Sequence, residues 1–141
     1  MTLPPLNEET CPAGTLLRPH TVTYTAEDIR RYLDETGERL DAYRVGGVLR
    51  VPFGMLLGQP IRIIHNNFHY ETGVHTASDL KVEALPVVGE VVTIGGHVAG
   101  HFERNRSKYV TLHVTVMSGD GRLLATIDHT SIYALATREA P

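Results

Sequence analysis

The sequence has 141 residues, of which 42% are hydrophobic, and its formal net charge at pH 7 is −3. A chain of this length and composition can bury one core, so we expect one domain. The 13 Lys and Arg residues are scattered rather than gathered in a stripe, which argues against nucleic acid as a partner. Cys11 is the only cysteine, so no intramolecular disulfide can form, as is typical of a cytoplasmic protein.

The first 19 residues are expected to form an extended arm that precedes one domain over residues 20–141. The arm contains prolines and acidic residues, and it lacks the basic start and the apolar run of a signal peptide. The longest uncharged apolar stretch, residues 51–61, is shorter than the roughly 20 residues needed to cross a bilayer. We therefore expect a cytoplasmic protein that makes no membrane contact.

A short amphipathic helix is predicted over residues 26–36. Its apolar residues recur at i, i+3 and i+4, which places them on one face. Thr25 precedes the helix as a candidate N-cap, Asp28 follows three residues later, and Gly37 stands after the last turn. These three residues are the usual start and stop signals of a helix.

A second helix is predicted over residues 51–68. Pro52 can occupy an early position, where its missing N–H costs nothing. The apolar residues fall on nearly every side until Arg62, which indicates a mostly buried helix. Pro60 is expected to kink or interrupt it, because proline removes a backbone donor and crowds the preceding turn.

From residue 72 onward the hydrophobic period is two, which predicts four strands over residues 72–85, 90–104, 107–117 and 123–135. In the second and third of these, the apolar residues expected on one face are Val92, Ile94, Val98 and Phe102, and Val110, Leu112, Val114 and Val116. Glycines at 95, 96 and 100 suggest a bulge or the close approach of another backbone. Helices followed by an antiparallel meander predict an α+β domain in which the sheet wraps a buried helix.

Three stretches carry a family resemblance: TGERLDAY at residues 36–43, VPFGMLLG at residues 51–58, and GVHTASDLKVEALPVVGEVV at residues 73–92. Together with the order of elements, they resemble the MaoC-like hydratases and dehydratases of the hot dog superfamily. The likeness covers roughly residues 20–136. It implies a hot dog fold that binds an acyl thioester of coenzyme A or acyl carrier protein in a tunnel at a dimer interface, in a homodimer or a heterodimer of hot dog subunits.

The catalytic motif of this family is Asp-x-Asn-Pro-x-His, in which the aspartate and the histidine act through water as acid and base. If Gly37 matches the glycine before that aspartate, Glu38 takes its place and Tyr43 takes the place of the histidine. The resemblance thus implies that Glu38 is the acid or base. A neutral phenol donates a proton or orients water, which is the role expected of Tyr43. Asp41, between them, is expected to contact the substrate.

Three further residues are candidates for the site. The backbone N–H groups of Gly54 and Met55, at the start of the second helix, are expected to bind the thioester carbonyl. His75 shares a predicted strand with Thr76 and Ser78 and is the best candidate for a catalytic histidine. Each group of candidates has a structural alternative. In these alternatives the loop with Glu38 is merely solvated surface, the helix start at Gly54 and Met55 is packed into the core, and His75 is a strand histidine hydrogen-bonded to a neighbour.

No metal or cofactor is expected. His65 and His69 have the i, i+4 spacing of paired ligands but lack the glutamate of His-Glu-x-x-His. His97 and His101 repeat that spacing on a predicted strand, where the rings lie too far apart to share an ion. The stretch GGHVAG at residues 95–100 has neither the order nor the following helix of a dinucleotide-binding fingerprint.

These observations favour an enzyme that adds or removes water across C2 and C3 of an acyl thioester. Two alternatives remain open. One is a non-catalytic hot dog subunit that supports a catalytic partner. The other is a thioesterase, in which a carboxylate activates water to attack the thioester carbonyl.

Overall fold

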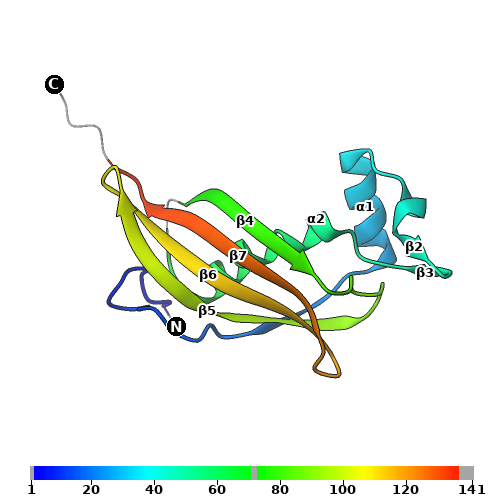
Figure 1. The fold of residues 1–141 in the computed structure, drawn as a ribbon, viewed down its shortest axis with the longest axis horizontal. Coiled ribbons are helices and arrows are strands. Elements are labelled where there is room, and N and C mark those ends of the chain that lie inside the picture. The colour runs from blue at the N-terminus through cyan, green and yellow to red at the C-terminus, as the bar shows by residue number, and fades with distance from the viewer. Residues whose placement is uncertain (1, 71–72, 137–141) are drawn as a thin grey trace.

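The computed structural model describes residues 2–70 and 73–136, and its main feature is a five-stranded antiparallel sheet (Figure 1). The strands lie in the order β1-β5-β6-β7-β4. Their bounds are β1 His20–Thr23, β4 Val74–Val82, β5 Val91–Arg104, β6 Ser107–Ser118 and β7 Leu123–Ala134. A second, small sheet pairs β2 Arg44–Val45 with β3 Val48–Leu49. The helices are α1 Ala26–Thr36, the 3-10 turn η1 Leu40–Tyr43, α2 Phe53–Leu56 and α3 Gln59–Asn67.

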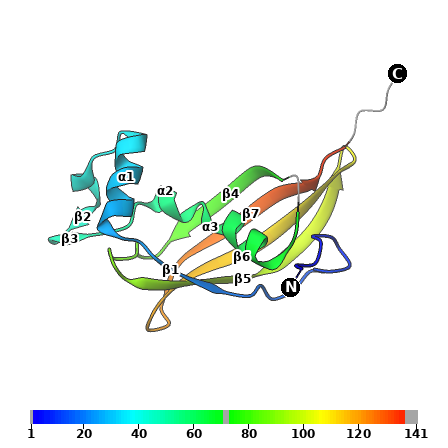
Figure 2. The same ribbon diagram turned by 180° about the vertical axis from the view of Figure 1, so that it is seen from behind.

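Helix α3 lies along one face of the sheet, as Figure 2 shows from behind. Ile63 and Ile64 of α3 are fully buried. They belong to the same core as the apolar side chains of β5, β6 and β7. Each such side chain stabilises the fold by roughly 1.5–3 kcal/mol when it leaves water. The prediction of an antiparallel sheet wrapped around a central helix is confirmed.

The helix predicted over residues 51–68 is divided in two. Helix α2 ends at Leu56, and α3 begins at Gln59 with a proline in its first turn. Pro60 therefore starts a new helix instead of kinking a continuous one, because its missing N–H is tolerated in the first turn. The predicted interruption is confirmed.

The caps of α1 are also confirmed. Thr25 Oγ1 accepts a hydrogen bond from the Asp28 backbone N–H, and Asp28 Oδ2 accepts one from the Thr25 N–H, each at 3.1 Å. Gly37 ends the helix with a φ of 74°, a conformation that costs glycine little.

The face prediction holds for β6 but fails at one residue of β5. Val110, Leu112, Val114 and Val116 are all buried. Phe102 was expected beside Val98, yet it is 38% exposed and stacks on Tyr109 of β6, with ring centroids 4.5 Å apart. The reason is a shift of register between Val98 and Gly100, which turns the rest of the strand over.

Gly96 meets the expectation of a close backbone approach. Its φ is 148°, and a Cβ atom there would overlap the backbone carbonyl of His113 on β6. Only glycine combines that φ with room for the neighbouring strand.

The predicted arm runs beside the sheet and is partly buried. Leu17 N–H donates to the Gly96 carbonyl, and Val98 N–H donates to the Thr15 carbonyl, each at 2.9 Å. Cys11 is fully buried. The sequence pattern missed β1, which follows the arm directly and pairs with β5. Among the helices of the described residues, none is long and apolar enough to cross a membrane.

A smaller region made of α1, η1, β2 and β3 extends beyond one end of the main sheet (Figure 1). Residues 86–88 connect it to the sheet. Val51 N–H donates to the Pro86 carbonyl at 2.8 Å, and Val88 N–H donates to the Leu49 carbonyl at 3.0 Å. These bonds fix β3 and the segment that leads into α2 to residues 86–88.

Candidate functional site

The loop after α1 joins two of the predicted residues. The Tyr43 hydroxyl donates a hydrogen bond to Glu38 Oε2. Tyr43 is buried at the end of η1, whereas Glu38 is exposed. Burial, followed by the hydrogen bond to Glu38 and the charge of Glu38, raises the pKa of Tyr43 to about 12. At neutral pH the phenol is therefore a proton donor beside a solvent-accessible carboxylate.

Tyr32, on the last turns of α1, belongs to the same cluster. Its pKa is raised, first by burial and then by the charge of Glu38, and it contributes in turn to the raised pKa of Tyr43. The Tyr32 hydroxyl lies directly against Gly54, where a Cβ atom would overlap it. Tyr32 thus brings the loop and the start of α2 together.

Sequence reasoning missed Tyr32 because it fell on the apolar face of a helix. The available signal was its position one turn before the loop that holds Glu38. A phenol on that face projects toward whatever the helix packs against. In this chain, the residue that faces the Tyr32 hydroxyl is Gly54, which has no side chain.

The other predicted residues near this cluster are differently engaged. Met55 N–H donates to the Pro52 carbonyl at 3.0 Å, so this amide is already used within the first turn of α2. Asp41 is exposed, and its backbone carbonyl accepts from the Arg44 N–H. The substrate-binding roles of Asp41, Gly54 and Met55 stay predictions.

His75 lies apart from Glu38 and Tyr43 within the chain. It is the second residue of β4, which begins at the end of the sheet away from α1 and η1 (Figure 1). Its Nε2 lies 3.3 Å from Ser78 Oγ, and its ring packs edge-on against His129 at 4.5 Å. The catalytic role of His75 stays a prediction.

His129 is the buried centre of that second cluster. Its Nδ1 lies 2.9 Å from Ser78 Oγ, and its Nε2 lies 2.5 Å from Ser131 Oγ. Burial, with a smaller contribution from His75, lowers the pKa of His129 to about 4. The imidazole is therefore neutral at neutral pH, with both ring nitrogens hydrogen-bonded.

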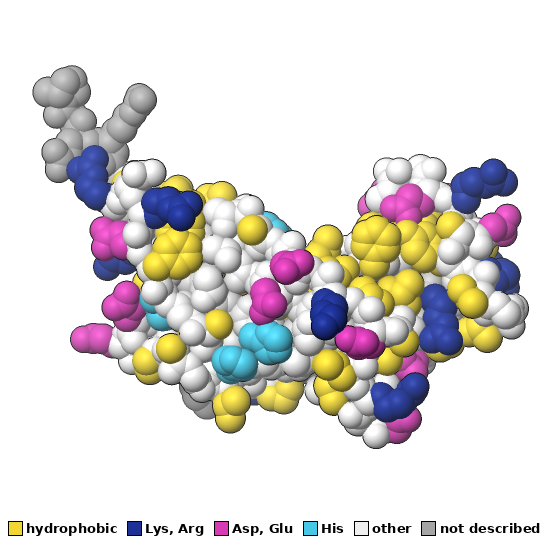
Figure 3. Space-filling view, viewed as in Figure 1, with side chains coloured by type: hydrophobic (Ala, Val, Ile, Leu, Met, Phe, Trp, Pro, Cys, Tyr) yellow, Lys and Arg dark blue, Asp and Glu magenta, His cyan; other side chains and the backbone are white. Residues whose placement is uncertain are grey.

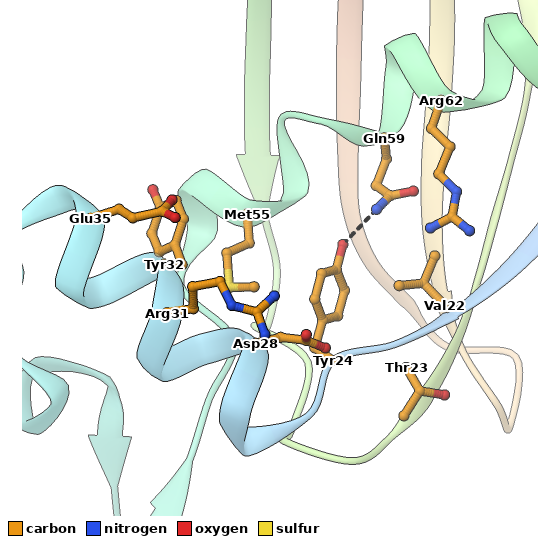
Figure 4. A pocket seen from close by; sticks show the side chains of 10 residues that line it. All are labelled: Val22, Thr23, Tyr24, Asp28, Arg31, Tyr32, Glu35, Met55, Gln59 and Arg62. Atoms are coloured by element: carbon orange, nitrogen blue, oxygen red, sulfur yellow. Dashed lines mark hydrogen bonds between the residues drawn. The ribbon is translucent and has the colours of Figure 1, made fainter.

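A pocket of about 320 Å³ opens between α1, β1 and the α2–α3 segment (Figure 4). Tyr32 and Met55 form part of its wall, so it adjoins the cluster around Gly54. Deeper in the wall, the Tyr24 hydroxyl accepts a hydrogen bond from Gln59 Nε2 at 2.9 Å. Across residues 2–70 and 73–136, no group of three or more His, Cys, Asp or Glu side chains has the arrangement of a metal site.

Solved structures of other proteins identify the fold of this chain. No protein-family model and no curated protein matches the sequence. A monoamine oxidase regulatory protein from Archaeoglobus matches 97% of this chain and 99% of its own, with a TM-score of 0.77 and 16% identity. A MaoC-like dehydratase from Rhodospirillum rubrum matches 94% of this chain and 99% of its own, with a TM-score of 0.70 and 12% identity. The chain has the hot dog fold.

A third similar structure is the truncated HadBC complex, a (3R)-hydroxyacyl-ACP dehydratase from Mycobacterium tuberculosis. Its TM-score is 0.72 at 12% identity, over 85% of this chain and 96% of that one. The hot dog fold predicted from the sequence is therefore confirmed. At these identities the likeness concerns the fold, and the chemistry of the site depends on its own residues.

Proposed function

We propose that this protein is a hydratase or dehydratase of acyl thioesters carried by coenzyme A or acyl carrier protein. The observation that supports this most is the hydrogen bond from the Tyr43 phenol to the Glu38 carboxylate, set against the Tyr32–Gly54 contact at the start of α2. A carboxylate and a protonated phenol in contact form an acid–base pair. If Gly37 matches the glycine that precedes the MaoC-like motif, Glu38 and Tyr43 take the positions of its aspartate and histidine.

In the hydration direction, Glu38 takes a proton from water as the water oxygen bonds to C3 of the enoyl thioester. Electrons of the C2–C3 double bond move toward the thioester carbonyl, and C2 then takes the Tyr43 proton. Glu38 returns its proton to the phenolate through the hydrogen bond that joins them. Water has been added, and both residues are restored. A phenol with a pKa of about 12 leaves a strongly basic phenolate, so this return is favourable.

The experiment measures the hydration of crotonyl-CoA as the loss of absorbance of its conjugated enoyl thioester. We expect Glu38→Gln and Tyr43→Phe each to lower kcat/KM by roughly 10²–10⁴-fold, because each removes one partner of the proton transfer. Asp34→Asn, an exposed residue elsewhere on α1, is the matched control. Full activity of Glu38→Gln would contradict the mechanism.

The edge of the main sheet offers a place for a second subunit, which the alternative of a non-catalytic subunit requires. Among the described residues, strand β4 lies at the edge of the sheet, pairs with β7 alone and has no buried residue. An unpaired nine-residue edge is a template for another strand. We infer that β4 pairs with a second copy or with a related hot dog subunit. Antiparallel pairing would bring the partner's His75 toward the α2 end of this strand.

The same assay separates the other candidate functions. The HadBC structure is a complex of subunits, so activity that appears only when a second hot dog protein is added would identify a supporting role. Release of free thiol, detected with a thiol reagent, would identify a thioesterase. Cys11 is fully buried, so its thiol should add little to that readout.

A further inference from the structure

The pocket beside Tyr32 has a polar wall built from residues far apart in the chain. Gln59, in the first turn of α3, is 6% exposed, and its Oε1 lies 2.9 Å from His20 Nε2 on β1. Its Nε2 donates to the hydroxyl of Tyr24, which is also 6% exposed. Burying an amide on a core helix is unfavourable unless both of its ends are bonded. Here both ends are bonded, and the chain of bonds leads to the pocket.

The directions of these hydrogen bonds leave one donor unused. An amide oxygen only accepts, so His20 donates from Nε2 to Gln59. Gln59 in turn donates to the Tyr24 oxygen, which leaves the Tyr24 hydroxyl hydrogen available to an acceptor in the pocket. Burial raises the pKa of Tyr24, so the phenol stays protonated at neutral pH.

Arg62 adds a positive charge at the same end of the pocket. It lies three residues after Gln59 on α3, and its guanidinium points to the side of Tyr24 and Val22 (Figure 4). The charge is near enough to lower the pKa of Tyr24 in part, against the larger effect of burial. Within residues 2–70 and 73–136, Arg62 makes no ion pair.

The other charges of the pocket are placed differently. Glu35 lies at the opposite end, beside Tyr32 (Figure 4). The Asp28 carboxylate accepts a hydrogen bond from the Thr25 N–H, within the cap of α1. Arg31 also lines the pocket, and it forms an ion pair with Glu27 at 3.4 Å. The end near Tyr24 therefore offers donors and an unpaired cation.

We propose that this pocket selects an acyl group whose far end carries a carboxylate, bound by the Tyr24 hydroxyl and the Arg62 guanidinium. The proposal rests on the proposed function, which we take to place the thioester near Gly54, next to Tyr32 and Met55 of the pocket wall. A pocket of about 320 Å³ lies at the low end of ligand sites, which favours a short chain. A guanidinium and a phenol bind a carboxylate by charge-assisted hydrogen bonds, which a methyl group cannot replace.

Turnover tests this selectivity with two substrates of equal carbon count. Crotonyl-CoA ends in a methyl group, and fumaryl-CoA ends in a carboxylate. We expect kcat/KM to favour fumaryl-CoA by about tenfold or more, and Arg62→Gln and Tyr24→Phe each to lower that ratio by about tenfold or more. Arg30→Gln, on the exposed face of α1, and Tyr109→Phe, on the hairpin of β5 and β6, are the matched controls. A ratio that favours crotonyl-CoA, or that neither variant changes, would overturn the proposal.

A binding experiment tests the selectivity for a terminal carboxylate without turnover. Analogues of succinyl-CoA and butyryl-CoA in which a methylene replaces the thioester sulfur are titrated by calorimetry. We expect the carboxylate analogue to bind about tenfold more tightly, and Arg62→Gln to remove the difference. Equal Kd values in the wild-type protein would overturn the proposal. If the carboxylate analogue binds more tightly but the protein hydrates neither substrate, the proposal for the pocket stands and the proposed function is wrong.

Discussion

The sheet with α3 and the smaller region beyond its end differ in how completely their apolar side chains are buried. In the sheet, strands of up to 14 residues pair along their length, and the side chains between β6 and α3 are fully buried. In the smaller region, β2 and β3 have two residues each, and Val45 and Val48 are 65% and 40% exposed. Apolar burial fixes the first region. The second, which carries Glu38 and Tyr43, is joined to the core by a few buried side chains, among them Ile29 and Leu33 of α1, and by hydrogen bonds to residues 86–88.

Because of this contrast, substitutions in the core should mainly change the free energy of unfolding, and substitutions near the site should mainly change activity. A closely packed core resists any change of volume, whereas a site held by few contacts can be altered without unfolding the protein. Substitutions in the two regions should therefore have different readouts. Ile63 and His129 belong to the sheet with α3, whereas Gly54 of α2 contacts the smaller region through Tyr32.

The largest effect is expected in the core. Ile63→Ala removes a fully buried side chain from α3 and should lower the free energy of unfolding by roughly 2–5 kcal/mol, because a cavity remains where the helix meets the sheet. The measurement is urea unfolding followed by circular dichroism. Val91→Ala, at a position that is 52% exposed, is the control and should change it by less than about 0.5 kcal/mol.

The next effect is a dependence of stability on pH, caused by His129. Its folded pKa of about 4 lies below the unfolded value near 6.5, so its contribution is fully present above pH 6.5 and is lost as the pH falls toward 4. The loss should be roughly 3 kcal/mol between these values, measured by unfolding at a series of pH values. His97→Gln, outside the buried cluster, should retain the loss. A protein equally stable at pH 7 and pH 4 would show that His129 is not buried as a neutral group.

The smallest change in stability is expected at Gly54. The Cβ of Gly54→Ala would overlap the Tyr32 hydroxyl and displace it, so hydration should fall by about tenfold or more. The free energy of unfolding should change by less than about 1 kcal/mol, since the change lies outside the main core. Hydration kinetics and thermal unfolding of the same samples measure the two effects.

Gly58→Ala is the matched control for that variant. Gly58 lies in the same connection, and a Cβ there meets no atom within 4 Å. Its hydration rate should equal that of the unsubstituted protein. In Gly54→Ala combined with Tyr32→Phe, the overlap with the hydroxyl is removed, so the two substitutions should be non-additive. Additive losses would show that the Tyr32–Gly54 contact does not order the site.

Most of the elements could be predicted because their signals are local. The cap formed by Thr25 and Asp28, the stop at Gly37 and the interruption before Pro60 each depend on residues within one or two turns. The alternation along β6 likewise follows from one buried face. The prediction for Phe102 was wrong because a register shift against the neighbouring strand is set by the pairing of two strands, which the pattern of one strand does not contain.

The candidate site could be predicted only in part. The loop pattern identified Glu38 and Tyr43, which the structure joins by a hydrogen bond. It could not identify Tyr32, whose role depends on Gly54 lying opposite it. It also could not place His75, because the position of a strand within a sheet depends on its partner strands.

By itself, then, the sequence determined the boundaries of α1, the interruption near Pro60 and the periodicity of the long strands, since each follows from the spacing of neighbouring residues. The tertiary structure decided which polar groups became neighbours. Tyr24 and Gln59 are 35 positions apart, and Ser78 and His129 are 51 apart, yet each pair is hydrogen-bonded. Such contacts form only when the whole sheet closes around α3, because the burial that stabilises them comes from every strand together.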